Sequence, residues 1–243
     1  MITKNEINNF LENPNKSYKI IKIDVKNNIK NFLQKINITD FNYYDYHGET
    51  NLLNIKDLID FLNCIGNNNK KSIESLAKFL KKLLFKISKE YIKQNNKKIY
   101  CWFTIRVSKP NEDYDIQRWH TDAKYYISDN FQSKFLLTLK GASTLVKDCN
   151  DKKIDKLNKI LEDSKKIINP IYEKEEYMRT RLLRNKLVKN DKIKKVKTLV
   201  NGIISLSNKT VHSEPRVKKD RIFLSILTMT KEEYELLLQR KFF

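Results

Sequence analysis

The sequence of 243 residues predicts an α+β fold, with helices concentrated in the first 96 residues and strands in the remainder. Residues 72–92 repeat apolar side chains at helical spacing, which is typical of an amphipathic helix that covers a core. Beyond residue 97, runs of β-branched and aromatic residues at 99–107, 135–144 and 201–206 predict strands. A chain of this length can bury a substantial core, so we expect one domain with extensions.

The region 1–96 is expected to be mostly helical and to pack on the β core. Its clearest element is the helix at 72–92, for which Ser72 is the expected N-cap and whose apolar side should lie against the outside of the core. Residues 17–25 alternate like a strand. His47, in a tyrosine-rich run with no partner pattern, is expected to lie in a turn.

The region 97–243 is expected to hold the β core, interrupted by a basic insertion at about 147–198. Pro170 divides this insertion into two helical patterns, at 152–164 and 173–188. The core resumes at 201–228. Thr230 and Glu233 then form a capping box that predicts a short final helix.

The net charge of +20 permits a nucleic-acid partner but does not establish one. Only eight of the 49 basic residues are arginine, the better bidentate reader of phosphates and bases. Richness in lysine, asparagine and isoleucine also suits an AT-rich genome, such as that of a protist or a large DNA virus. A polyanionic substrate therefore stays open.

The remaining composition indicates an intracellular protein, in the cytoplasm or nucleus, with no membrane partner. The three cysteines, Cys64, Cys101 and Cys149, lack CxxC spacing, so neither a disulfide framework nor a zinc cluster is indicated. No run reaches the length of a membrane span, and the N-terminus lacks the apolar stretch of a signal peptide.

His120, Asp122 and His212 form the candidate metal site. On an extended segment residues i and i+2 point to the same side, so His120 and Asp122 can present a nitrogen and an oxygen to one ion. His212 would supply the third ligand, and the pattern uses two of the three histidines in the chain. Two histidines and one carboxylate form the facial triad of non-haem Fe(II) oxygenases, which leaves positions open for substrate and O2. Zinc is the alternative metal.

From about Tyr100 to Leu227 the sequence resembles the 2-oxoglutarate- and Fe(II)-dependent dioxygenases, whose double-stranded β-helix carries HxD…H followed by a basic residue. The strand at 99–107, the turn at Pro110, the HxD motif and the strands at 135–144, 201–206 and 210–215 follow the family order. The resemblance implies a jelly-roll, cupin-like core with supporting helices. It also implies Fe(II) as cofactor, and 2-oxoglutarate and O2 as cosubstrates.

The resemblance implies that Arg221, nine residues after His212, pairs with the distal carboxylate of 2-oxoglutarate, which suits its planar guanidinium. The common Arg-x-Ser pattern is absent, because Phe223 stands at i+2 and the serine at i+4, although strand alternation keeps all three on one face. The further residues expected near the cosubstrate are Ser225, Thr104, Arg106 and Tyr100, and also Tyr125 and Tyr126. The candidate substrate contacts are Arg118, Tyr125, Tyr126, Arg179, Arg181 and Arg184.

Three of these arginines lie in the basic insertion, which in this family often borders the active-site mouth, so we expect a substrate-contacting flap there. The leading expectation is a hydroxylase that acts on a macromolecule, specifically a protein side chain. A nucleic-acid-modifying oxygenase is the alternative, although its demethylase subgroup usually has a second arginine where this chain has Leu227. A non-catalytic basic nucleic-acid-binding protein on a cupin-like scaffold is a third possibility, and the oligomeric state is left open.

Overall fold

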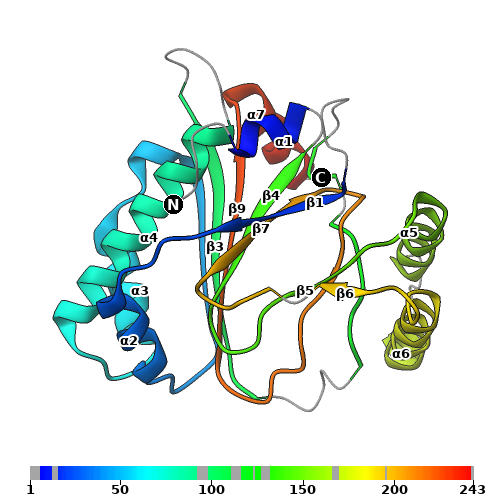
Figure 1. Cartoon of the computed structure of the whole chain (residues 1–243), viewed down its shortest axis with the longest axis horizontal. Coiled ribbons are helices and arrows are strands. Elements are labelled where there is room, and N and C mark those ends of the chain that lie inside the picture. Colours follow the sequence, from blue (N-terminus) through cyan, green and yellow to red (C-terminus); the bar gives the residue numbers. More distant parts are fainter. Residues whose placement is uncertain are drawn as a thin grey trace.

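Two antiparallel sheets form the centre of the molecule (Figure 1). The computed structural model describes residues 6–12, 16–91, 98–110, 116–122, 124–126, 132–165, 170–194 and 196–241. The larger sheet has the strand order β1-β7-β4-β9-β3-β2, and the smaller has the order β6-β5-β8. The strands are β1 (Tyr18–Lys22), β2 (Asn42–Glu49), β3 (Tyr100–Ser108), β4 (Ser133–Lys140), β5 (Leu145–Lys147), β6 (Ile193–Lys194), β7 (Asn201–Leu206), β8 (Val211–Ser213) and β9 (Arg221–Met229).

From β3 onward the chain passes back and forth between the two sheets. It runs through β3 in the larger sheet, then through a short segment at His120 that bridges to His212 of β8 in the smaller sheet, and returns to β4. Strands β5 and β6 follow in the smaller sheet, β7 in the larger, β8 in the smaller and β9 in the larger. This alternation gives a double-stranded β-helix, so the predicted jelly-roll core is confirmed.

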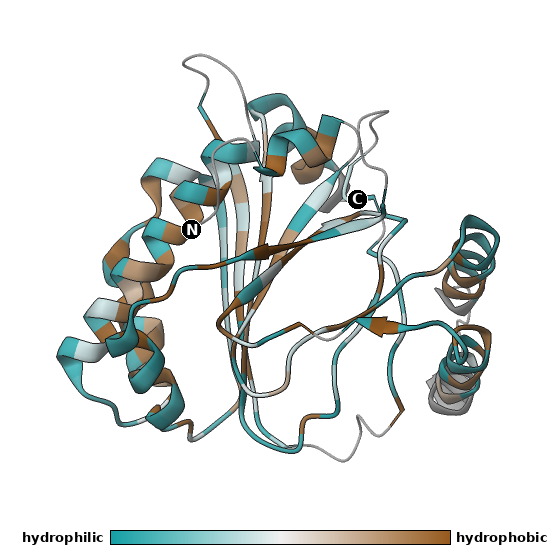
Figure 2. Ribbon diagram, in the orientation of Figure 1, coloured by the Kyte–Doolittle hydropathy of each residue, from teal (hydrophilic) through white to brown (hydrophobic). Residues whose placement is uncertain are grey.

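The helices are α1 (Glu6–Glu12), α2 (Asn27–Lys35), the 3-10 turn η1 (Thr50–Leu52), α3 (Ile55–Cys64), α4 (Lys70–Tyr91), α5 (Asp151–Lys165), α6 (Pro170–Leu187) and α7 (Lys231–Lys241). Helices α2, α3 and α4 cover the outer face of the larger sheet, on the left of Figure 1, whereas α5 and α6 lie on the right, beside the smaller sheet. The apolar side of α4 joins one continuous core with β3 and β9, which confirms the expected packing of this helix. Figure 2 shows hydrophobic and hydrophilic residues alternating along it, as an amphipathic helix requires.

Strand alternation separates the two faces of the larger sheet. On β9, Ile222, Leu224 and Ile226 belong to the core beneath the helices. Arg221 and Ser225, at the intervening positions, therefore face the interior between the two sheets. The interior face therefore carries buried polar and charged side chains together with apolar ones such as Phe223.

The strand predicted at 17–25 is β1, and the capping box is confirmed, since Thr230 N donates to Glu233 Oε2 over 2.8 Å and Glu233 N to Thr230 Oγ1 over 3.3 Å. The N-cap of α4 was predicted wrongly. Asn69 holds that position, because its side-chain oxygen accepts from the backbone N–H of Ser72 over 3.1 Å.

His47 is not in a turn. It lies within β2, opposite Trp102 of β3, and the two ring centroids are 4.8 Å apart. Because β2 is extended, the neighbouring tyrosines alternate between the two faces of this edge strand. Among the helices within the described ranges, none is long and apolar enough to cross a membrane.

Candidate metal centre

His120, Asp122 and His212 converge in the interior between the two sheets. One potential ligand atom from each residue lies within 4.8 Å of the others, close enough to share a single ion. A pair of backbone hydrogen bonds, each of 2.9 Å, joins His120 to His212 in both directions, and their ring centroids are 4.3 Å apart. The short antiparallel bridge therefore brings together ligands that are distant in sequence.

The two imidazoles are held in the tautomer that suits a metal ligand. His120 Nδ1 donates to the carbonyl oxygen of Arg118 over 2.7 Å, and His212 Nδ1 donates to that of Thr210 over 3.1 Å. A carbonyl can only accept, so Nδ1 carries the proton and the Nε2 lone pair is available. Burial, aided by the neighbouring His212, lowers the pKa of His120 to about 4, which keeps its ring neutral at physiological pH.

The Asp122 carboxylate is ionised and lacks a full set of partners. Burial alone would raise its pKa, but the positive charge of Lys134, the electrostatic influence of the two imidazoles and a hydrogen bond from Tyr125 outweigh burial and hold that pKa well below the usual range. Its Oδ2 atom is buried and has no hydrogen-bond partner in the described ranges, while Oδ1 lies 3.9 Å from His212 Nε2. An unpaired buried carboxylate oxygen is costly. A cation held by two nitrogens and this oxygen would satisfy it, and Fe(II) fits that donor set.

Arg221 is a second buried charge on the interior face. Only 2% of its surface is exposed, and it donates from Nε to the carbonyl of Ala142 over 3.0 Å and from Nη2 to Thr144 Oγ1 over 3.1 Å. Among the residues that the structure describes, no carboxylate lies within 4.0 Å of it. Burial lowers the pKa of Arg221 to about 10, although Glu214 opposes this effect. A buried guanidinium without a counter-ion is a site for an anionic group.

Arg118 and Glu214 form an ion pair beside the two histidines. Each lies two residues from one of them, so the antiparallel bridge places the pair on adjacent strands. Arg118 Nε donates to Glu214 Oε2 over 3.3 Å, and Arg118 Nη2 donates to Oε1. Arg106 Nη1, from the larger sheet, lies 3.9 Å from the same Oε1 atom. Burial would raise the pKa of Glu214, but His120 and Arg118 lower it to about 2, so this carboxylate links charges from both sheets.

The basic insertion supports the metal-binding segment from outside. Trp119 is 1% exposed and packs with Leu157 of α5 and with Val188, which follows α6. Thr121 Oγ1 donates to Asn158 Oδ1 of α5. Because Trp119 and Thr121 alternate with His120 and Asp122, the outward residues anchor the segment while the inward residues can bind metal.

This arrangement corrects the expectation of a substrate-contacting flap at two of its three arginines. Arg184 is 2% exposed, and its Nη1 donates to the carbonyl oxygen of Trp119 over 3.1 Å. Arg181 is also buried, whereas Arg179 is exposed. The buried pair faces protein, because the two insertion helices pack against the smaller sheet.

Comparisons with known proteins show a likeness of fold. No protein-family model matches the sequence, and no curated protein matches it. The structure of JOX2 in complex with 2OG, Fe and JA aligns with a TM-score of 0.45 and 9% identity, over 90% of this chain and 69% of that one. A prolyl-4-hydroxylase from Pseudomonas putida gives 0.39 and 7%, over 93% and 97%. A viral collagen prolyl hydroxylase from Paramecium bursaria Chlorella virus-1 gives 0.38 and 11%, over 88% and 91%. With TM-scores below 0.5, the activity has to be inferred from the side chains of the site.

The residues expected around the cosubstrate are spread along the barrel. Thr104 and Ser225 face the interior and share a hydrogen bond of 2.6 Å, but Ser225 is four residues along β9 from Arg221, about 13 Å at the strand rise. Tyr100 lies opposite Met229 at the far end of β9 and stacks on Tyr234. Ser225 and Tyr100 therefore lie well away from Arg221 along β9.

The two tyrosines after the HxD motif differ in their surroundings. Burial and the Asp122 carboxylate raise the pKa of Tyr125, whose hydroxyl accepts a hydrogen bond of 3.2 Å from Lys134. Tyr126 is buried in a cluster with Leu237 of α7, against which the ring of Tyr125 also packs. Sequence reasoning missed Lys134, Glu214 and Thr144. Because Glu214 lies two residues after His212, strand alternation could have predicted that both side chains point to the same face. No feature of the sequence marked Thr144 as the neighbour of Arg221.

Proposed function

We propose that this chain is an Fe(II)- and 2-oxoglutarate-dependent dioxygenase that hydroxylates a protein side chain. The observation that carries the proposal is the buried Arg221 guanidinium, which has no described carboxylate partner and faces the same interior as the His120, Asp122 and His212 triad. The triad alone would also suit zinc. A buried, unpaired cation in the same interior supports a cosubstrate with two anionic ends.

Each residue would have a separate task. The neutral His120 and His212 and the ionised Asp122 would hold Fe(II), and Arg221 would bind the distal carboxylate of 2-oxoglutarate. The bonds from Arg221 to Ala142 and Thr144 fix the direction of its guanidinium before any ligand arrives. With O2, the bound iron and cosubstrate would convert a substrate C–H bond into an alcohol, while 2-oxoglutarate becomes succinate and CO2.

Two observations support a protein substrate over a nucleic acid. Arg181 and Arg184 are buried and directed into the protein, so two arginines of the insertion are withdrawn from phosphate contact. Leu227 is completely buried and packs near Tyr126 and Met229. It occupies the place where a second arginine would be expected in a nucleic-acid demethylase.

The first test is an anaerobic titration of the protein with Fe(II) and 2-oxoglutarate. We expect a visible metal-to-ligand charge-transfer band, followed by succinate release once O2 is admitted. His212→Ala should lose both signals, while His47→Ala, a histidine outside the triad, should keep them. A wild-type protein with neither band nor succinate would contradict the proposed activity.

The substrate class needs a second assay. The loaded protein would be incubated with a peptide library and, separately, with methylated oligonucleotides, and the products analysed by mass spectrometry. The proposal expects peptides that gain one oxygen atom. Loss of methyl groups from the oligonucleotides, with unmodified peptides, would replace the protein substrate by a nucleic acid.

A further inference from the structure

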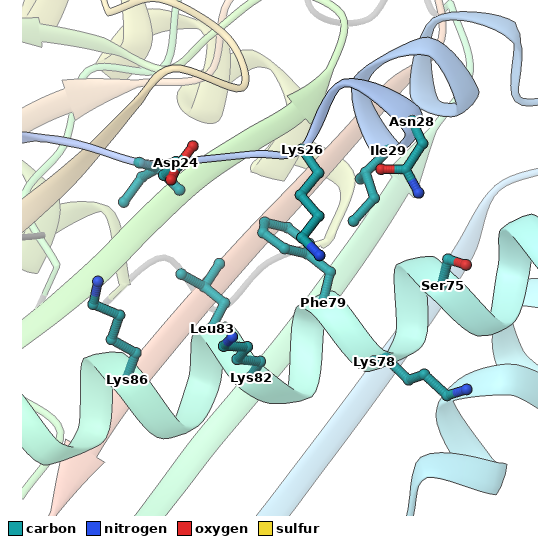
Figure 3. Close-up of a pocket in the computed structure, with 11 residues that line it drawn as sticks. Asp24, Lys26, Asn28, Ile29, Ser75, Lys78, Phe79, Lys82, Leu83 and Lys86 are labelled. Carbon is teal, nitrogen blue, oxygen red and sulfur yellow. The ribbon is translucent and has the colours of Figure 1, made fainter. Parts of the chain in front are cut away.

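A groove with basic walls lies on the outer side of the larger sheet, away from the metal centre (Figure 3). It runs between α4 and the segment that joins β1 to α2, and its volume is about 420 Å³. Ile29, Phe79 and Leu83 contribute to its apolar floor. Leu83 belongs to the core between the helices and the sheet, so the groove and the triad lie on opposite sides of that sheet.

Four lysines border this groove. Lys78, Lys82 and Lys86 recur every four residues on α4, so they follow one side of the helix at intervals of about 6 Å. Lys26 reaches toward them from the opposite wall, as Figure 3 shows. Within the described part of the chain, no carboxylate lies within 4.0 Å of any of the four ammonium groups. Of the described lining residues only Asp24 is acidic, so the groove carries an excess of positive charge.

The floor distinguishes this groove from an ordinary solvated lysine surface. Phe79 is only partly buried, so its ring leaves apolar surface accessible between the charges, whereas Ile29 and Leu83 are almost fully buried. Sites for single-stranded nucleic acid usually combine basic residues with several aromatic platforms. The described lining offers a single aromatic ring, Phe79, and otherwise aliphatic side chains. The lining therefore favours a peptide over a nucleic acid.

We propose that this groove binds an acidic peptide segment in which an apolar side chain lies between aspartate or glutamate residues. The apolar side chain would cover the partly exposed Phe79, and the carboxylates would pair with Lys26, Lys82 and Lys86. The site is separate from the triad, so it does not depend on the proposed activity.

The test measures binding of a fluorescein-labelled peptide of repeating Glu-Leu-Glu to the full chain by fluorescence anisotropy at physiological salt. The double variant Lys82→Glu/Lys86→Glu should weaken binding about tenfold or more. The double variant Lys70→Glu/Lys71→Glu makes the same charge change on exposed positions of α4 outside the groove and should weaken it less than about twofold. A Glu-Gln-Glu peptide, which has the same charge without the apolar residue, should bind more weakly than the leucine peptide.

A third variant separates occupancy of the groove from charge. Ser75→Trp would fill the groove at an incompletely buried position without changing any charge, and it should also reduce binding of the leucine peptide. Thermal melting of each variant would confirm that it is folded. The proposal would be overturned if the wild type did not bind the leucine peptide, if the two double variants lost affinity equally, or if the two peptides bound equally well. It would also be overturned if an oligo(dT) probe bound more tightly than the leucine peptide and lost more affinity in the groove variants.

Discussion

Arg184 donates a hydrogen bond of 3.1 Å from Nη1 to the carbonyl oxygen of Trp119, the residue directly before His120. Its Nε atom donates to the Thr180 carbonyl oxygen over 3.2 Å, so the guanidinium is fixed to its own helix as well. Asn185 adds a further bond, from Nδ2 to the Gln117 carbonyl oxygen. Helix α6 therefore holds the backbone of the metal-binding segment at two points, and this support should set how well His120 is positioned.

Replacing Arg184 with methionine should weaken Fe(II) or Co(II) binding by about tenfold, since loss of outer-shell support commonly costs about 10-fold to 100-fold in metal affinity. Anaerobic calorimetric titration would measure the effect. Arg179→Met is the matched control, because it removes the same charge from an exposed position of the same helix. If the two variants bound metal equally well, α6 would have no role in positioning the ligand.

Metal binding should also stabilise the folded protein, because the triad is assembled only when the two sheets are in place. At a free metal concentration of about 100 times the dissociation constant, one site contributes about 2.7 kcal/mol to the free energy of unfolding. Thermal melting with and without a chelator should reveal this increment in the wild type and in His47→Ala. His212→Ala should show no increment. A metal-dependent shift that survives in His212→Ala would place the ion elsewhere.

The Glu214→Gln variant tests the charge balance near Arg221. Glu214 places a negative charge close to Arg118 and Arg106, and it influences the pKa of Arg221. Its neutralisation should therefore strengthen binding of the dianion 2-oxoglutarate by roughly threefold to tenfold.

The effect would be read from the anaerobic 2-oxoglutarate titration of Glu214→Gln. Glu49→Gln is a suitable control, since Glu49 pairs with Lys98 at the end of β2, over 3.1 Å. We expect unchanged affinity there. Weaker cosubstrate binding in Glu214→Gln would mean that the carboxylate is needed to hold the arginines in place.

The sequence allowed the centre of the site to be predicted because its geometry is local. Alternation of side chains along an extended segment was enough to predict that His120 and Asp122 share one face. The same rule predicted that Arg221 and Ser225 share one face of β9. The amphipathic period of α4 likewise predicted which side of that helix is buried. These features depend on periodicity within a single element, and so a single sequence is enough to predict them.

The errors arose where distant segments determine the environment. The arginines of the insertion were expected to contact substrate because they cluster in a charged run, yet Arg184 donates to a backbone carbonyl 65 positions away. Thr144 became the neighbour of Arg221 through a turn, across 77 positions. His47 was assigned to a turn because the strand that pairs with it begins only at Tyr100, far along the chain. Such pairings depend on topology and not on local pattern.

Arg221→Met should separate cosubstrate binding from metal binding. Charge-assisted hydrogen bonds contribute about 1.5 to 3 kcal/mol each, so loss of the guanidinium should weaken 2-oxoglutarate binding about 100-fold. Fe(II) affinity should stay unchanged, because Arg221 is not in the triad. The ligand-free protein should keep its free energy of unfolding to within about 1 kcal/mol, because the cost of burying an uncompensated charge disappears with the charge.

The Arg221→Met measurement combines anaerobic titration with thermal melting in the presence and absence of 2-oxoglutarate. Wild-type protein should melt at a higher temperature when the cosubstrate is added, and the variant should show almost no shift. Arg216→Met is the control, since it removes an equal charge from an exposed position and should respond like the wild type. A variant at Arg221 that still binds 2-oxoglutarate normally would show that another cation holds the distal carboxylate. A variant that loses stability without ligand would instead identify this arginine as a structural support of the barrel.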